Sequence, residues 1–285
     1  MKLCSYRYEG SDRYGVMSDD GIVDLSARIG DKHSTLVRLI RDQAIDEARA
    51  VSDGLSPDYR FDEVEFLPLT SETVQIICVG LNYKDHLAET GKAPAEFPGA
   101  FTKIRQSFVG HNQPIVRPGA SHQYDFEGEY TIVIGKPARH VSVEDALEYV
   151  AGYTILNDGS IRDYQIGRDV FQGKNFWHTS SIGPCMTTRD AAPAWEETVI
   201  ETRLNGAVMQ HSTIDQLIFS VPYLVSYFSQ QTALQPGDMI STGTPGGVGH
   251  RRTPPVYMKP GDVLEIEISG IGILRNPVMD EAHEV

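Results

Sequence analysis

The chain contains two neighbouring stretches, Tyr124-Asp-Phe-Glu-Gly-Glu-Tyr-Thr-Ile-Val-Ile-Gly135 and Gly152-Tyr-Thr-Ile-Leu-Asn-Asp-Gly-Ser-Ile-Arg-Asp163. In the first, residues 126–134 alternate in the manner of a β-strand. In the second, the apolar run Tyr153–Leu156 predicts another strand, which ends just before a polar turn. The two stretches therefore predict a pair of strands with acidic residues close to their ends.

Three carboxylates accompany these predicted strands. Glu127 and Glu129 are two residues apart on one strand, so they project from the same face at a spacing of roughly 6 to 7 Å. Asp158 follows the second strand and can supply a third oxygen ligand. Oxygen ligands without Cys or His suit Mg²⁺, Mn²⁺ or Ca²⁺ rather than zinc. An acid pair on a solvated strand face is the commoner cause of this spacing, so the metal interpretation depends on the rest of the chain.

The composition is that of an ordinary globular protein. The chain has 285 residues, of which 40% are hydrophobic and 22% charged, enough for one large domain or a large domain with a small one. Its net charge of −14 argues against nucleic acid or an anionic membrane surface as a partner. We expect a cytoplasmic protein, because Met1 is not followed by an apolar leader and no segment has about 18 uninterrupted apolar residues. Cys4, Cys78 and Cys185 are widely spaced and indicate small buried side chains rather than disulfides or a thiolate metal site.

The first part of the chain predicts a small N-terminal α/β domain. Residues 1–25 have the pattern of short strands broken by polar turns, and residues 34–51 have helical apolar periodicity. Residues 74–79 form a continuous apolar run that is typical of a buried strand. We therefore expect a domain boundary near residue 70, which separates domains at 1–70 and 71–285.

The sequence of the larger domain predicts an α+β fold in which strands dominate. Its strand-like segments are residues 130–134, 153–156, 198–204, 207–211, 239–242, 263–268 and 273–276. Asn205-Gly206 predicts a type I′ turn between two of them. Helices are few, and we expect them at about 142–150 and 214–231. The lack of a regular βαβ alternation argues against a Rossmann or TIM-barrel architecture.

Three further candidates for chemistry lie outside the acidic stretches. In a helical turn His86 and Glu89 share one face, where the carboxylate can hold one ring nitrogen and leave the other to accept a proton from water. A surface ion pair is the commoner explanation of that spacing. Lys174 lies among apolar residues and can contact a substrate carboxylate or an oxyanion, although a lone lysine is usually solvated. The glycine-rich residues 241–249 lack the Lys-Ser/Thr ending of a nucleotide-binding loop, but their N–H groups can still bind an anion.

In combination these segments resemble the fumarylacetoacetate hydrolase family over about residues 70–278. The matching segments are, in order, GLNYKDHLAETG from Gly80, FTK from Phe101, DFEGE from Asp125, GYTILNDGSIRDYQ from Gly152, QGKNF from Gln172 and STGTPGGVG from Ser241. The resemblance implies a mixed β-sandwich roll that is mostly β, a small N-terminal α/β domain and commonly a homodimer.

The resemblance also implies roles for individual residues. They are Glu127, Glu129 and Asp158 as ligands of Mg²⁺ or Mn²⁺, which Ca²⁺ can replace in a crystal, His86 as general base with Glu89 as its partner, and Lys174, Gln165 and Thr244 as substrate or oxyanion contacts. Tyr83, Arg162 and His178 are further candidates for lining the site, with packing as the alternative role. Trp177 and His178 stand where many members carry an Asp and a small residue, which bears on the identity of the substrate.

The activity that the resemblance implies is metal-dependent hydrolysis of a C–C bond in a 2,4-dioxo acid of the acylpyruvate or fumarylpyruvate type, in the breakdown of aromatic compounds. The ion would stabilise the enolate that forms, while His86 activates water. The same site can serve oxaloacetate decarboxylation, or isomerisation and decarboxylation of 5-carboxymethyl-2-hydroxymuconate and 2-hydroxyhepta-2,4-diene-1,7-dioate. The non-enzymatic alternatives are a metal-dependent oxo-acid-binding protein, which would have no need of a base at His86, and a structural Ca²⁺-holding β-domain. The expected partners are a small oxo acid and a second copy of the chain.

Overall fold

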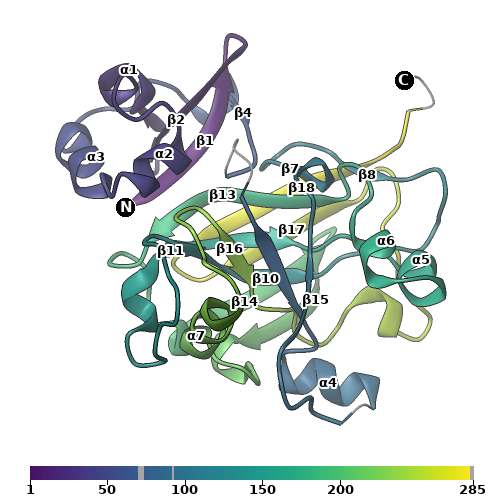
Figure 1. The fold of residues 1–285 in the computed structure, drawn as a ribbon. Coiled ribbons are helices and arrows are strands. Elements are labelled where there is room, and N and C mark those ends of the chain that lie inside the picture. Colours follow the sequence, from purple (N-terminus) through teal and green to yellow (C-terminus); the bar gives the residue numbers. More distant parts are fainter. Residues whose placement is uncertain (70–73, 92, 283–285) are drawn as a thin grey trace.

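The computed structural model describes residues 1–69, 74–91 and 93–282, and a long mixed sheet runs through it (Figure 1). Its strands lie in the order β3-β2-β1-β13-β11-β10-β16-β5-β6. Their bounds are β1 Lys2–Tyr8, β2 Ser11–Met17, β3 Ile22–Asp24, β5 Ile76–Gly80, β6 Gly99–Thr102, β10 Gly128–Ile134, β11 Val150–Asn157, β13 Ser180–Thr188 and β16 Met239–Ser241. Two short strands join its side, β4 (Glu65–Phe66) on β1 and β7 (Phe108–Val109) on β13.

A second sheet packs against the first and closes the main core. Its order is β15-β14-β17-β18-β8, with bounds β8 Ile115–Arg117, β14 Val199–Leu204, β15 Ala207–Thr213, β17 Val263–Ile268 and β18 Gly272–Asp280. Alternate residues of β17 are buried, as expected for a sheet with one solvated face. Ile266 and Ile268 belong to the same hydrophobic cluster as Ile132 and Ile155 of the long sheet. The strand-dominated α+β class predicted from the sequence is confirmed.

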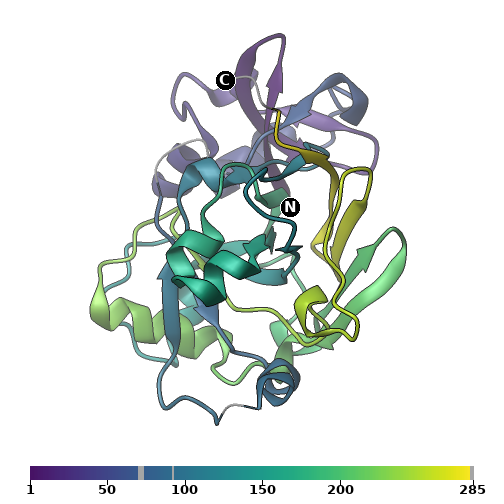
Figure 2. The same ribbon diagram turned by 90° about the vertical axis from the view of Figure 1, so that its right-hand side faces the viewer.

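Helices lie outside the two sheets. The α-helices are α1 Ser26–Ile29, α2 Leu36–Arg41, α3 Ile45–Ser52, α4 Lys84–Thr90, α5 Arg162–Gly167, α6 Val170–Lys174 and α7 Val221–Gln231. The 3₁₀ turns are η1 Phe61–Glu63, η2 Arg105–Ser107, η3 Ala146–Tyr149, η4 Trp195–Glu197, η5 Ile214–Gln216 and η6 Gly249–Arg251. Figure 1 shows α1, α2 and α3 beside β1 and β2 at one end of the molecule and α4 at the other, and Figure 2 shows the pair α5 and α6 (teal) on a third side. Among the described residues, no helix is both long enough and apolar enough to cross a bilayer.

The N-terminal strands continue the long sheet rather than forming a sheet of their own. Leu3 of β1 pairs with Met186 of β13, so the first hairpin is hydrogen-bonded to the rest of the chain. The boundary predicted near residue 70 falls next to residues 70–73, which lie outside the described residues. The division at that point therefore stays a prediction.

Backbone conformation agrees with the predicted turn and divides one predicted helical segment in two. Asn205 and Gly206, between β14 and β15, have φ of 53° and 78°, as a type I′ turn requires, and this prediction is confirmed. The helical pattern predicted over 34–51 is confirmed, and it forms two helices because Gln43 has a φ of 54° and separates α2 from α3.

Tertiary hydrogen bonds shorten the other two predicted helices. The helix expected at 142–150 is only the turn η3, because Val150 already pairs with Ile134 in the long sheet. The helix expected at 214–231 is the turn η5 followed by α7. Between them the backbone N–H groups of Ile218 and Phe219 donate to the carbonyl and side-chain oxygens of Asn82, at 2.7 and 2.8 Å. These contacts replace the helical hydrogen bonds.

Candidate metal and proton-transfer site

The three predicted metal ligands meet where β10 and β11 begin and end. β10 starts at Gly128, so Glu127 lies just before the strand rather than within it as predicted, and Asp158 follows β11. The backbone N–H of Asp158 donates to the carbonyl of Glu127 at 2.8 Å. One carboxylate oxygen from each of Glu127, Glu129 and Asp158 lies within 4.8 Å of the others, and all three residues are buried.

Two buried lysines neutralise part of this charge. Lys174 Nζ lies 2.8 Å from Glu127 Oε2 and 2.6 Å from Asp158 Oδ2. Lys103 Nζ lies 2.6 Å from Asp158 Oδ1 and also donates to the main-chain carbonyl of Lys174. Lys103 is not among the predicted site residues, and its only signal in the sequence is its place in the FTK segment of the resemblance.

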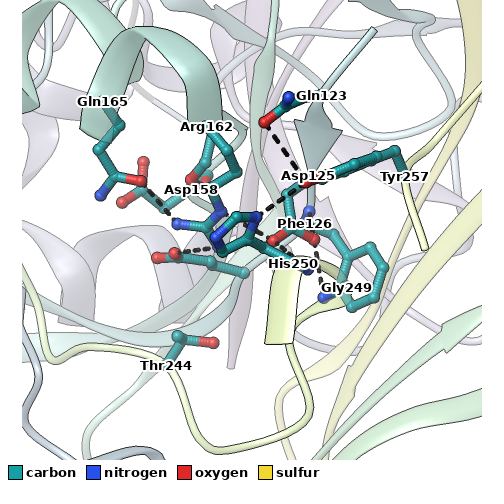
Figure 3. A network of polar contacts seen from close by, with 12 residues as sticks. Gln123, Asp125, Phe126, Asp158, Arg162, Gln165, Thr244, Gly249, His250 and Tyr257 are labelled. Atoms are coloured by element: carbon teal, nitrogen blue, oxygen red, sulfur yellow. Dashed lines mark hydrogen bonds and ion pairs between the residues drawn. The ribbon is translucent and has the colours of Figure 1, made fainter. Parts of the chain in front are cut away.

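Arg162 supplies a third positive charge from the start of α5. Its Nη2 lies 2.7 Å from Glu127 Oε1 and 2.7 Å from Asp125 Oδ2, and its Nη1 donates to Gln165 Oε1 at 2.7 Å. Figure 3 shows Arg162 with Gln165 and Asp125 beside it, and Thr244 lower in the same view. Both Arg162 and Gln165, predicted to face the substrate, thus belong to the polar network that contains Glu127.

The two glutamates differ strongly in their electrostatic surroundings. Burial alone would raise the pKa of Glu127, but the charges of Lys174 and Arg162 outweigh it and lower the pKa to about 2. Burial and the adjacent carboxylates of Asp158 and Glu127 hold the pKa of Glu129 well above its usual range. Within the described residues, Glu129 has no ion pair and accepts a hydrogen bond from the Ser241 hydroxyl.

A His–Glu pair on α4 lies close to this cluster. The contact between His86 Nδ1 and Glu89 Oε2 is 3.2 Å, which leaves Nε2 for another partner. Glu89 Oε1 accepts from the N–H of Gly247 at 2.8 Å, so the glycine-rich segment helps to hold the carboxylate. The same segment is bonded through Thr244 to the carbonyl of Gly128, between Glu127 and Glu129, so it joins the His–Glu pair to the acidic cluster.

The remaining predicted residues are distributed differently. Thr244 is buried, donates to the carbonyl of Gly128 at 2.9 Å and accepts from Gln210 at 2.8 Å, so it fixes the glycine-rich segment to β10. Tyr83 is fully buried in the main hydrophobic cluster. Trp177 and His178 stack at a ring distance of 3.7 Å and line a separate cavity of about 430 Å³ between the N-terminal strands and the body.

The donor set fits a hard divalent cation. Carboxylate oxygens are the ligands that Mg²⁺ and Mn²⁺ prefer, and no Cys or His belongs to the group. An ammonium group already bridges two of the three carboxylates, which shows that the position favours positive charge. Glu127, Glu129 and Asp158 are therefore the residues that can hold such an ion.

Comparison with known proteins gives one consistent result. A family model described as fumarylacetoacetate (FAA) hydrolase C-terminal matches residues 75–279. The mitochondrial oxaloacetate tautomerase Fahd2a of Rattus norvegicus is 35% identical over 263 residues, which are 91% of this chain and 84% of that protein.

Solved structures agree over nearly the whole chain. A fumarylacetoacetate hydrolase from psychrophilic Exiguobacterium antarcticum has 34% identity and a TM-score of 0.83, covering 99% of this chain and 100% of that one. The maleylpyruvate hydrolase from Sphingobium sp. SYK-6, in complex with manganese(II) and pyruvate, has 27% identity and a TM-score of 0.83 over the same shares. Together with the acidic triad, the manganese complex supports a divalent metal at this site.

Proposed function

Because the chain belongs to the fumarylacetoacetate hydrolase family, we propose that it is a divalent-metal-dependent enzyme that forms the enolate of a small 2-oxo acid. Its reaction is the keto–enol tautomerisation of a 2-oxo dicarboxylate of the oxaloacetate type. The observation that carries the proposal is the buried triad of Glu127, Glu129 and Asp158 beside a His–Glu pair. The similarity to an oxaloacetate tautomerase over 91% of the chain favours this reaction among those of the family.

The positive charges of the site can stabilise the negative charge that develops on the substrate during enolisation. Held by Glu127, Glu129 and Asp158, a divalent ion would supply charge that stabilises a developing oxyanion on the 2-oxo group. Lys174 places an ammonium in the same cluster and opposes the same charge. One such preorganised contact is worth on the order of 10² to 10³ in rate.

His86 is the group that moves the proton. Its Nδ1–H is directed at Glu89, so Nε2 is the free base. Nε2 accepts a proton from C3 of the substrate, the electron pair of that C–H bond forms the C2–C3 double bond, and the negative charge moves to the C2 oxygen. Return of the proton to this oxygen gives the enol. Glu89 stabilises the intervening imidazolium by its negative charge.

Hydrolysis of an acylpyruvate is the second candidate, and the same His–Glu pair favours it. His86 can accept a proton from water as the oxygen attacks the C4 carbonyl, and the C3–C4 bond then breaks to give a carboxylic acid and the enolate of pyruvate. The imidazolium returns its proton to C3 of that enolate. The manganese and pyruvate complex of a maleylpyruvate hydrolase with the same fold supports this alternative.

The proposal is tested on chelator-treated protein with and without added Mg²⁺ or Mn²⁺. Decay of the enol form of oxaloacetate is followed by ultraviolet absorbance, and pyruvate release is followed from oxaloacetate and from a panel of acylpyruvates. We expect metal-dependent acceleration of enol decay without pyruvate release from oxaloacetate. Pyruvate release from an acylpyruvate alone would assign the hydrolase instead, and release from oxaloacetate a decarboxylase. Binding of oxo acids with no turnover in any assay would refute an enzymatic role.

A further inference from the structure

Asp125 is a buried carboxylate beside the site that the proposed chemistry does not use. It is fully buried on β9 (Tyr124–Asp125), and its two oxygens accept from four N–H groups and form an ion pair with a fifth nitrogen. The backbone N–H groups of Phe126, Gly249 and His250 lie at 2.9, 2.8 and 3.0 Å, and Arg162 Nε lies at 2.8 Å with Nη2 at 2.7 Å. Figure 3 shows Asp125 between Arg162 and the Gly249–His250 turn.

The local backbone holds these partners close together. β9 pairs with β12 (Ser160–Ile161) in a two-stranded sheet, and the N–H of Arg162 donates to the carbonyl of Gln123 at 3.0 Å. An added Cβ at Gly249 would lie 1.9 Å from the Val256 carbonyl oxygen and 2.6 Å from Asp125 Oδ1. Only glycine fits between that backbone and the carboxylate.

The Arg162 guanidinium lies between two carboxylates, Asp125 and the predicted metal ligand Glu127. Its Nη2 lies 2.7 Å from both Asp125 Oδ2 and Glu127 Oε1, and neither contact has the angles of a hydrogen bond. The charge is therefore divided between the carboxylates rather than committed to one of them. Asp125 also accepts a hydrogen bond from Arg162 Nε, whereas Glu127 contacts only Nη2. Asp125 therefore holds the guanidinium in place at two nitrogens.

We propose that Asp125 is a positioning residue that holds part of the Arg162 charge away from Glu127 and so keeps Glu127 available to a divalent ion. The inference rests on the proposed function, because it takes Glu127 as a metal ligand. Without the negative charge of Asp125, the buried guanidinium would have one acid left to neutralise it and would pair with Glu127 more tightly. An entering cation would then have to displace Arg162.

The test is the affinity of chelator-treated protein for Mn²⁺, measured by isothermal titration calorimetry. Asp125→Asn should weaken Mn²⁺ binding by roughly tenfold, the size expected for coupling through one shared buried charge. The double variant Asp125→Asn with Arg162→Gln should restore binding to within about threefold of wild type, because the competing charge is gone. A merely structural role for Asp125 would lower thermal stability without this rescue.

Two further variants make the result decisive. Asp24→Asn removes a matched buried acid that pairs with Arg13 on the far strands of the sheet, and it should bind Mn²⁺ as wild type does. Arg162→Gln alone should bind Mn²⁺ at least as tightly as wild type, and this variant decides the matter if Asp125→Asn does not fold.

The inference is overturned by wild-type affinity in folded Asp125→Asn, by lack of rescue in the double variant, or by weaker binding in Arg162→Gln. A wild-type protein that binds no Mn²⁺ would instead refute the proposed function, and the inference with it.

Discussion

Two of the regions in which the long sheet buries carboxylates neutralise them in different ways. On β3, Asp24 is 1% exposed, and Arg13 Nη1 lies 2.6 Å from its Oδ2. Tyr59 and the N–H of Ala27 also donate to it. Around β10 and β11, four buried carboxylates share three cationic side chains. The acids are Asp125, Glu127, Glu129 and Asp158, and the cations are Lys103, Lys174 and Arg162.

The difference separates an acid that holds the fold from acids that serve a site. One cation for one carboxylate satisfies the Asp24 pair within the protein itself. The second cluster leaves Glu129 without an ion pair among the described residues, and its pKa is raised by burial and by the neighbouring acids. Crowded like charges of this kind destabilise the fold unless a cation or proton joins them, and they are typical of functional sites.

The largest expected effect comes from removing a charge of the crowded cluster. Glu129→Gln keeps the size of the side chain and an oxygen that Ser241 can reach, but removes one metal ligand. We expect Mn²⁺ affinity to fall by at least about 10²-fold and activity to fall to background. The metal-free protein should be as stable as wild type or more so, because a repulsion is lost.

Calorimetric titration and urea unfolding of the metal-free protein measure both quantities. Unchanged metal affinity would show that Glu129 is not a ligand. A large loss of metal-free stability would show that Glu129, like Asp24, holds the fold.

Removing the base should affect turnover but not the acid cluster. His86→Ala leaves all three predicted ligands in place, so Mn²⁺ affinity should stay within a few-fold of wild type. We expect kcat to fall by roughly 10² to 10³, the usual contribution of general-base catalysis. The Glu89→Gln variant should lose less kcat than His86→Ala, because it keeps the His86 imidazole. Initial rates at saturating substrate check the order of the variants, and equal activity of His86→Ala and wild type would exclude His86 as the base.

Removing the charge of Asp24, which pairs with Arg13, should lower stability but leave metal binding and turnover unchanged. Asp24→Asn should lower the free energy of unfolding by about 2 kcal/mol, less than the roughly 3–5 kcal/mol of a fully buried pair because Arg13 keeps some solvent contact. Metal affinity and kcat per folded molecule should not change. Urea unfolding with parallel activity assays tests this, and a drop in kcat without a drop in stability would contradict it.

Local sequence patterns predicted most strands but not the helix ends. Alternation and the Asn205-Gly206 turn are local properties, and the corresponding strands form as expected. The helix predicted over 214–231 failed because Asn82, far away in the sequence, takes the backbone hydrogen bonds of Ile218 and Phe219. The sequence around residue 218 contains no local pattern that predicts this contact with Asn82.

The candidate site divides in the same way. Spacing indicated Glu127 and Glu129, and the structure brings them together with Asp158. Lys103 pairs with Asp158 across 55 positions, and Ser241 donates to Glu129 across 112. A single lysine or serine has no periodicity that could predict its partner, so these residues appear only once the strands are packed.

The smallest expected effect concerns a half-buried histidine that has no acidic partner among the described residues. Among the described residues, His111 has no ion pair, and its Nδ1 accepts from the N–H of Arg275 at 3.1 Å while its ring meets Phe66 edge to face. Burial, helped by the charge of Arg275, lowers the pKa of His111 to about 4. The folded pKa is below the ordinary value of about 6.5, so the unfolded chain binds the proton more readily between these values.

Stability should therefore fall as the pH is lowered from 6.5 towards 4. His111→Asn keeps an acceptor for Arg275 and cannot gain this charge, so its profile should be flatter than that of wild type. The difference between pH 7.5 and 5 should be about 1 kcal/mol, since the limit of about 2 kcal/mol for this window is reduced by the solvent that still reaches the ring. Urea unfolding of both proteins at the two pH values gives this difference. Parallel profiles would mean that the His111 ring is already charged, or freely solvated, in the folded protein.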